Sequence, residues 1–495
     1  REYDGLIVVI TPDSQESERL QEQLRFFSHQ EALEIHCFPD WETLPYDSFS
    51  PHQDIVSQRL ETLHRLPGLD RGIILVPAGS LLQRLPPRGF IDQYSLVVDK
   101  GDRLDLDNLR QRLDKAGYRC VAQVMEHGEF SVRGSILDLF PMGSSLPCRL
   151  DLFDDEVDSI RTFDPETQLS IEQTQAIRLL PAREFPLDEQ AIRRFRQTWR
   201  ELLEGDPQRS QIYRDVSNGL AANGSEYYLP LFFEHTASLF DYLPECYSVV
   251  ESEDARTAIR HFRDEVDERY EQLRHDTERP LLSPETLYLG EEETRSHLSM
   301  CACLNIQRSE SMDTGADTQV FATRTLPSLR IQARAERPAA ALQDFVTDFP
   351  GRLLLCAESA GRREVLQAQL REFGLRAKTV DDWQTFIDSD IPLALTVAPF
   401  EKGVWLDTAP AIGIITEAQL FGERALQQLR RKPKRDADAI VRNLTDLHIG
   451  APVVHEDHGV GRYLGLQSLD IGGTRAEFLS LEYAGNDKLY VCLLY

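Results

Sequence analysis

The stretch from Glu126 to Asp164, EHGEFSVRGSILDLFPMGSSLPCRLDLFDDEVDSIRTFD, alternates apolar and polar residues over several short runs. Successive side chains of a β-strand point to opposite faces of the sheet. A strand over the run RLDLF therefore turns Leu150 and Leu152 toward a core. The same alternation turns Arg149 and Phe153, with the aspartate between them, to the other face. This pattern predicts strands that display side chains on a surface, as a docking site does, rather than a catalytic pocket.

An exposed phenylalanine beside an arginine is a typical hot-spot pair of protein–protein interfaces. Arg133 lies on the neighbouring predicted strand, Ser-Val-Arg-Gly, and joins Arg149 and Phe153 if the strand register allows it. The alternative is that Phe153 packs under a loop and that the arginines are ordinary surface charges. The pattern alone leaves both interpretations open.

Length and charge set wider limits. A chain of 495 residues is too long for one core, so several domains are expected. Its formal charge of −28 disfavours nucleic acid as the partner of most of the surface. No apolar run reaches the roughly 18 residues that a membrane span needs, which predicts a soluble protein without a membrane partner.

The eight cysteines show neither a disulfide nor a zinc-site spacing, which is typical of a protein in the reducing cytoplasm. The start at Arg1, close before a strand, is typical of a fragment.

The first hundred residues alternate buried strands with helices. An apolar run at 6–10 precedes leucines at helical spacing within 16–27, and a strand-like run at 72–76 repeats the unit. A similar unit returns at 352–373, either as a duplicated half of the first or because any strand–turn–helix has this pattern. The fold class is predicted to be α/β and multidomain.

Six segments follow from these patterns. We expect an α/β domain, a small α+β insert, a second α/β domain, a basic linker and a small C-terminal β-barrel that is cut short. Their predicted bounds are 1–97 and 181–317 for the first α/β domain, 98–180 for the insert, 318–428 for the second α/β domain, 429–445 for the linker and 446–495 for the barrel.

Residues that would carry catalysis are mostly absent from the sequence. It contains no Gly-x-x-x-x-Gly-Lys-Ser/Thr loop that would cradle phosphates. His455 and His458 lack further metal ligands at a suitable spacing, and the acidic run at 154–158 is more typical of a hairpin turn. No catalytic residue and no metal ligand are therefore predicted. The basic run is a possible nucleic-acid contact, although a solvated linker is the plainer interpretation; its residues are Arg430, Arg431, Lys432, Lys434 and Arg435.

Three stretches together resemble one protein family. The run FPDWETLPYDSFSPH at 38–52, the stretch at 126–164, and His455-x-x-His458-Gly-Val-Gly-Arg-Tyr463 are similar to the bacterial transcription-repair coupling factors. The similarity extends over essentially the whole chain. It implies an amino-terminal module built like the excinuclease B subunit, then an α/β domain, then the start of an RNA polymerase interaction domain.

The resemblance also implies partners and site residues. Arg133, Arg149 and Phe153 match the family's contact positions for the excinuclease A subunit. Leu469 matches the contact leucine for the RNA polymerase β subunit, with a barrel core residue as the alternative. The implied function is an adaptor that binds stalled polymerase and recruits excision repair. Double-stranded DNA, ATP and magnesium would be bound mainly by a motor that this sequence lacks.

One departure from the excinuclease B subunit matters for function. After His52 the chain enters a predicted helix at 55–66 within a few residues, which leaves no room for the long β-hairpin with which that subunit clamps DNA. We therefore expect that damage verification is lost. Because the sequence also has no lysine-bearing phosphate loop, we expect no enzyme activity and no cofactor in this chain. The alternative is a DNA-binding helicase-like module with its own ATPase.

Overall fold

The computed structural model describes residues 5–28, 33–307, 318–332, 337–422, 452–455, 459–471, 474–483 and 488–492. The chain divides into two compact units, 1–422 and 423–495.

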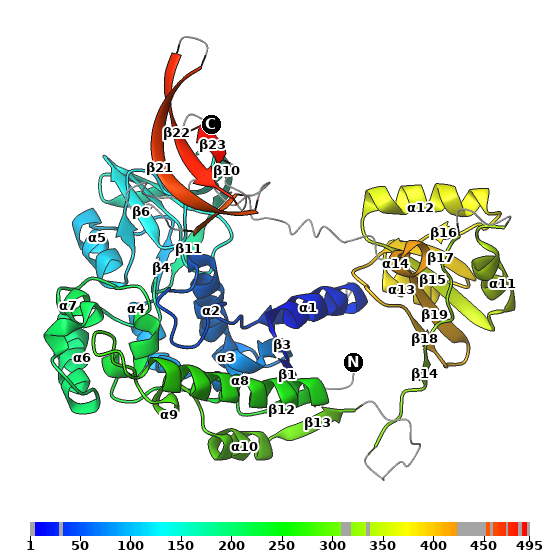
Figure 1. Ribbon diagram of the computed structural model, residues 1–495, viewed down its shortest axis with the longest axis horizontal. Helices are drawn as coiled ribbons and strands as arrows, with labels where there is room; N and C mark the ends of the chain where they lie inside the picture. Colours follow the sequence, from blue (N-terminus) through cyan, green and yellow to red (C-terminus); the bar gives the residue numbers. More distant parts are fainter. Residues whose placement is uncertain are drawn as a thin grey trace. The chain divides into compact units, whose positions relative to one another are not determined.

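A five-stranded parallel sheet forms the centre of the first domain (Figure 1). Its strand order is β13-β12-β1-β3-β2. All six residues of β3 are buried, which explains its continuous apolar sequence GIILVP. The predicted buried strands at 6–10 and 72–76 are therefore confirmed. The strands are β1 (Leu6–Thr11), β2 (Ile35–Cys37), β3 (Gly72–Pro77), β12 (Tyr247–Ser252) and β13 (Ala302–Ile306).

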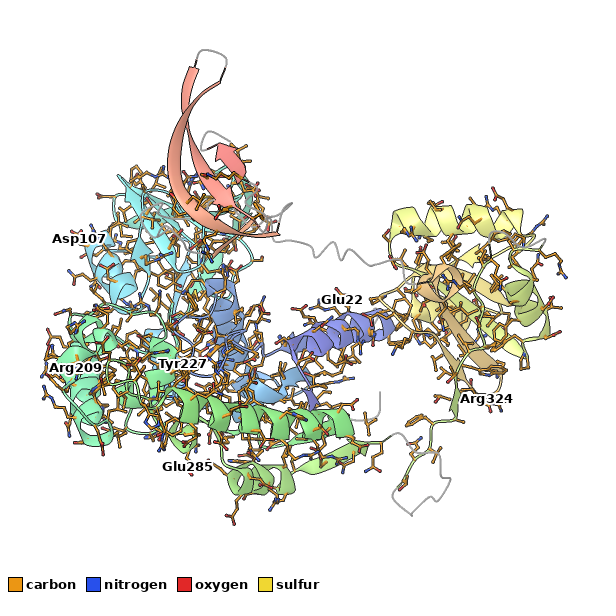
Figure 2. The ribbon with its side chains drawn as sticks, in the orientation of Figure 1. Glu22, Asp107, Arg209, Tyr227, Glu285 and Arg324 are labelled. Atoms are coloured by element: carbon orange, nitrogen blue, oxygen red, sulfur yellow. The ribbon has the colours of Figure 1, made fainter. Side chains whose placement is uncertain are left out.

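Helices pack on this sheet and beside it. A close approach between α3 and α8 depends on Gly79, because a Cβ atom there would lie 3.0 Å from a ring carbon of Phe262. Tyr227, labelled in Figure 2, stacks edge-on against Trp41 at 5.5 Å. The helices of this domain are α1 (Ser14–Ser28), α2 (Gln53–Arg65), α3 (Ala78–Leu82), α4 (Arg88–Tyr94), α6 (Glu189–Leu202), α7 (Gln211–Ser217), α8 (Glu253–Leu273), α9 (Pro284–Leu287) and α10 (Glu291–Ser299), with 3₁₀ turns at Leu66–Gly68, Pro207–Arg209, Ser225–Phe232 and Leu239–Tyr242.

A two-stranded ribbon marks where the insert domain begins and ends. Strand β4 (Leu96–Asp99) pairs antiparallel with β11 (Ala176–Leu179), and Leu96 lies opposite Leu179. Between them lie α5 (Leu106–Lys115), which carries Asp107 of Figure 2, and a six-stranded sheet. The sheet has the order β10-β9-β8-β7-β6-β5. Its strands are β5 (Arg119–Cys120), β6 (Glu129–Arg133), β7 (Ile136–Leu139), β8 (Cys148–Phe153), β9 (Glu156–Phe163) and β10 (Ser170–Thr174).

A buried ion pair joins α2 to the segment that follows the insert domain. Arg59 donates from Nε to Oε1 of Glu184 at 2.5 Å, and both side chains are almost fully buried. Its Nη1 donates to the carbonyl oxygen of Pro39 at 2.8 Å. The guanidinium also lies over the ring of Phe38, 4.3 Å from its centroid. Buried charges require such partners, so this contact fixes α2 against the exit of the insert.

The second α/β domain has a sheet of the order β14-β18-β19-β15-β17-β16. The series β19-β15-β17-β16 repeats the connectivity of β12-β1-β3-β2 in the first domain, including the helix after its first strand. This match is consistent both with duplication of half of the first domain and with the strand–helix connectivity that α/β domains commonly share. The elements are β14 (Thr323–Arg324), α11 (Ala340–Asp348), β15 (Gly351–Ala357), α12 (Ala360–Glu372), β16 (Lys378–Thr379), α13 (Trp383–Asp388), β17 (Leu393–Val397), β18 (Val404–Leu406), β19 (Ala411–Thr416) and α14 (Glu417–Phe421).

The second unit contains four strands that pair in chain order. They are β20 (Pro452–His455), β21 (Gly459–Ile471), β22 (Thr474–Glu482) and β23 (Lys488–Cys492), all antiparallel to their neighbours. The sequence pattern predicts a short strand at 461–466, and this was wrong, because β21 has 13 residues. It continues through Gly465, where the register shifts. Closure of these strands into a barrel stays a prediction.

The architecture as a whole is mixed α/β with several separate sheets. Within the described ranges, no helix is both long enough and apolar enough to span a membrane.

Candidate functional site

One face of the insert sheet carries the side chains that the alternation selected. The register places Asp138 of β7 opposite Arg149 of β8, and Ile136 opposite Asp151. Arg133 of β6 lies opposite Ile136. Residues opposite each other in an antiparallel pair share a face, so Arg133, Asp138 and Arg149 lie on the same side of the sheet. Arg133 and Arg149 therefore lie on one face, as predicted, but their strands are not neighbours, because β7 lies between β6 and β8.

A buried carboxylate connects the two arginines. Asp138 has no exposed side-chain area, and it accepts a hydrogen bond from Nη2 of Arg133. Arg149 binds the same carboxylate with two donors, Nε to Oδ1 at 2.7 Å and Nη2 to Oδ2 at 3.0 Å. A two-point arginine–carboxylate contact fixes the plane of the guanidinium as well as its position. Asp138 was not among the predicted site residues.

Arg149 is less exposed than predicted. Its side chain is 19% exposed, against 54% for Arg133. The guanidinium lies over the ring of Phe163, 4.9 Å from the centroid, and its Nη1 donates to the carbonyl oxygen of Gln168 at 3.4 Å. The hydrogen bonds that Arg149 donates to the Asp138 carboxylate raise the pKa of Arg149 above its usual value. The prediction that Arg149 is displayed to solvent was therefore wrong. Its guanidinium is bound to Asp138 and packed over Phe163, and only a small part of the side chain reaches the solvent.

Phe153 has the exposure that the pattern predicts. Leu150 and Leu152 are buried, whereas Phe153 at the end of β8 is 80% exposed. It lies opposite Glu156, so Asp154 and Asp155 form the turn between β8 and β9. Asp154 has a φ of 60°, as tight turns require. The acidic run is thus a hairpin turn, and the alternative that Phe153 packs under a loop does not apply.

A third arginine extends this face. Arg161 of β9 lies opposite Arg149, and its Nη2 is 3.0 Å from Oδ2 of Asp151. Like charges opposite each other on a sheet repel, and here each arginine is bound to a separate acid. Asp151 also accepts a hydrogen bond from the Ser159 hydroxyl at 2.9 Å. Residues Arg133, Asp138, Arg149, Asp151, Phe153 and Arg161 are called the arginine face below.

The start of α1 is the position at which a nucleotide-binding fold would hold phosphate. Here the preceding Asp13 accepts a hydrogen bond from the N–H of Glu16 at 2.8 Å. The helix begins with Glu16 in its first turn. Two carboxylates at this helix start oppose the binding of a phosphate anion.

The other residues singled out from the sequence lie outside the arginine face. In the described ranges, no three or more His, Cys, Asp or Glu side chains are arranged to hold a metal ion. His455 ends β20, while His458 and the basic run lie outside the described residues; the basic residues are Arg430, Arg431, Lys432, Lys434 and Arg435. Leu469 lies in β21, where the backbone register pairs it with Ala476 near the end of the β21–β22 hairpin.

Three family models match separate parts of the chain. A UvrB interaction domain matches residues 96–185, which include the arginine face. A MFD, D3 domain matches residues 345–420, and a CarD-like/TRCF RID domain matches residues 447–493. The three matches follow one another in this order along the chain.

Two of these relatives are transcription-repair-coupling factors. The one from Haemophilus influenzae is 44% identical over 491 residues, which is 98% of this chain and 42% of the relative. The one from Escherichia coli K12 is 43% identical over 496 residues, 99% of this chain and 42% of the relative. The chain is a relative of the transcription-repair coupling factors. The resemblance predicted from the three sequence stretches is thereby confirmed.

The similarity to transcription-repair coupling factors includes relatives of lower sequence identity. The factor from Bacillus subtilis is 25% identical over 522 residues, which cover 98% of this chain. The chain spans 42% of the length of these relatives. Within that part, the arginine face lies in the segment that matches the UvrB interaction domain.

Proposed function

We propose that this chain is an adaptor that links RNA polymerase to nucleotide excision repair. In this proposal the insert domain recruits the excinuclease A subunit, and residues 446–495 bind the polymerase β subunit as part of a small β-barrel. The observation that carries the proposal is the presence, in one chain, of a UvrB interaction domain and a CarD-like/TRCF RID domain. A protein with one site for RNA polymerase and another for the excinuclease A subunit can bring the two together.

The arginine face supports the repair half of this proposal. Phe153 is exposed, as an anchor that enters a partner's pocket must be. Arg133 and Arg149 stand beside it on a rigid sheet, so little side-chain freedom is lost when a partner binds. The surface is therefore prepared for a protein partner that offers an apolar pocket next to acidic groups.

Replacing Arg149 and Phe153 together by alanine tests this half. We expect affinity for the excinuclease A subunit to fall by at least about 30-fold, the effect of losing one hot spot of about 2 kcal/mol. Pull-down and titration calorimetry measure it. A matched control is Arg193→Ala with Phe321→Ala, because those side chains are 75% and 76% exposed and lie outside the insert domain. Unchanged binding by the Arg149/Phe153 variant would refute the surface.

The polymerase half rests on the C-terminal strands. We propose that one edge of the sheet adds to a sheet of the polymerase β subunit, with main-chain hydrogen bonds supplying affinity and apolar side chains supplying register. Leu469, near the end of the β21–β22 hairpin, is the proposed contact residue.

The proposal includes no ATP hydrolysis by this chain. Asp13 and Glu16 place negative charge where an α/β ATPase would bind phosphate, and the sequence has no lysine-bearing phosphate loop. We expect no ATP turnover above background by residues 1–495, with or without duplex DNA. A coupled ATPase assay measures this. DNA-stimulated turnover would favour the helicase-like alternative.

A further inference from the structure

Asp138 lies beneath the two arginines of the proposed docking surface and contacts both. Its side chain is fully buried, and its two oxygens accept the hydrogen bonds from Arg133 and Arg149. It comes from β7, the strand between those that carry the two arginines. Burying a carboxylate in this position costs solvation free energy, and the two arginine partners offset that cost.

The surroundings of Asp138 show which part of the surface depends on it. Leu137 and Leu139, its neighbours along β7, are buried on the opposite face. On its own face, Ser131 of β6 is its register partner on one side and Arg149 on the other. Asp151, the second acid of this face, is bound to Arg161 and Ser159 instead. Asp138 is therefore the acid that holds Arg133 and Arg149.

We propose that Asp138 is a positioning residue for partner binding: it does not touch the partner, and it holds Arg133 and Arg149 in the orientation that the partner recognises. This inference rests on the proposed docking function. The two-point contact with Asp138 fixes the guanidinium plane of Arg149. The single contact with Asp138 holds Arg133 on the same face as Arg149, while about half of the Arg133 side chain stays exposed. The partner chemistry that fits is a carboxylate-bearing protein surface that meets two arginines at a set spacing.

The test is a double-mutant cycle on the full chain, with the excinuclease A subunit as the probe. Asp138→Asn keeps the shape and one acceptor oxygen but removes the charge. We expect it to weaken binding about tenfold in the wild-type background. In the Arg133→Ala/Arg149→Ala background we expect a further change below about twofold, since residues that act through each other are not additive. An effect confined to stability would instead be the same in both backgrounds.

Two further variants serve as a second test of the contact and as a control. Arg149→Lys retains the charge but cannot make the two-point contact, so it should lose about as much affinity as Asp138→Asn. It also serves if Asp138→Asn does not fold. Glu417→Gln is the matched control, because Glu417 is a buried acid paired with Arg362 in the second α/β domain. It should leave binding unchanged.

Three results would overturn the inference. Asp138→Asn could bind within twofold of wild type, it could weaken binding equally in both backgrounds, or Arg149→Lys could bind as wild type. Each of these leaves the docking function standing if the Arg133→Ala/Arg149→Ala variant binds poorly. Normal binding by that double variant would instead refute the surface itself and its positioning residue with it.

Discussion

Replacing Arg59 by alanine is expected to lower the free energy of unfolding by about 3–5 kcal/mol, the cost of leaving one member of a buried ion pair alone. The guanidinium of Arg59 satisfies the Glu184 carboxylate and the Pro39 carbonyl, and no water reaches either side chain of the pair. Without it, the hydrogen-bond donor that remains for Glu184 within the described residues is the indole N–H of Trp41, at 3.4 Å. Urea titration followed by tryptophan fluorescence measures the loss.

Arg65 provides the control for this experiment. It lies on the same helix and pairs with Glu61, but its side chain is 49% exposed, so Arg65→Ala should cost less than about 1 kcal/mol. The double variant Arg59→Met/Glu184→Leu should recover most of the loss, since two apolar side chains of similar volume need no charge partner. A cost below about 1 kcal/mol for Arg59→Ala would mean that water enters and solvates Glu184.

Leu469→Arg is expected to abolish binding to the RNA polymerase β subunit. Strand addition needs an edge whose side chains fit the partner, and an arginine at the proposed contact brings a charge that must lose its water. Titration of the full chain with the isolated β-subunit domain, followed by fluorescence anisotropy, measures the effect.

The two docking halves provide each other's controls. The Leu469→Arg variant should bind the excinuclease A subunit normally, because Leu469 belongs to a compact unit separate from the one with the arginine face. The Arg149→Ala/Phe153→Ala variant should bind the polymerase normally. Polymerase affinity that survives Leu469→Arg would argue against strand addition at this position.

Local patterns predicted the faces of the insert strands well. Along Arg149–Phe153, the two-residue period separated the buried leucines from the exposed phenylalanine, because a strand with one buried face needs apolar residues at every second position. Helix positions were also predictable. The expected helix at 55–66 is α2 at Gln53–Arg65, since its apolar residues recur at helical spacing.

Contacts between strands were not predictable in the same way. Asp138 is a single acid between two leucines, and its partners lie on two other strands, so its role depends on a register that no local pattern contains. A lone acid inside an apolar strand was the available signal. Strand β12 joins the first sheet from far along the chain, beside β1, and only the sheet itself reveals that neighbour.

The β4–β11 ribbon has a consequence for how such a protein changes over evolution. Because Leu96 and Leu179 are direct partners, the whole insert leaves and re-enters the first domain at one place. The order and direction of the parallel strands do not depend on what lies between these two residues. A gene segment that encodes this insert can therefore be gained, lost or exchanged without changing the order of the host strands, and the proposed docking surface would move with it.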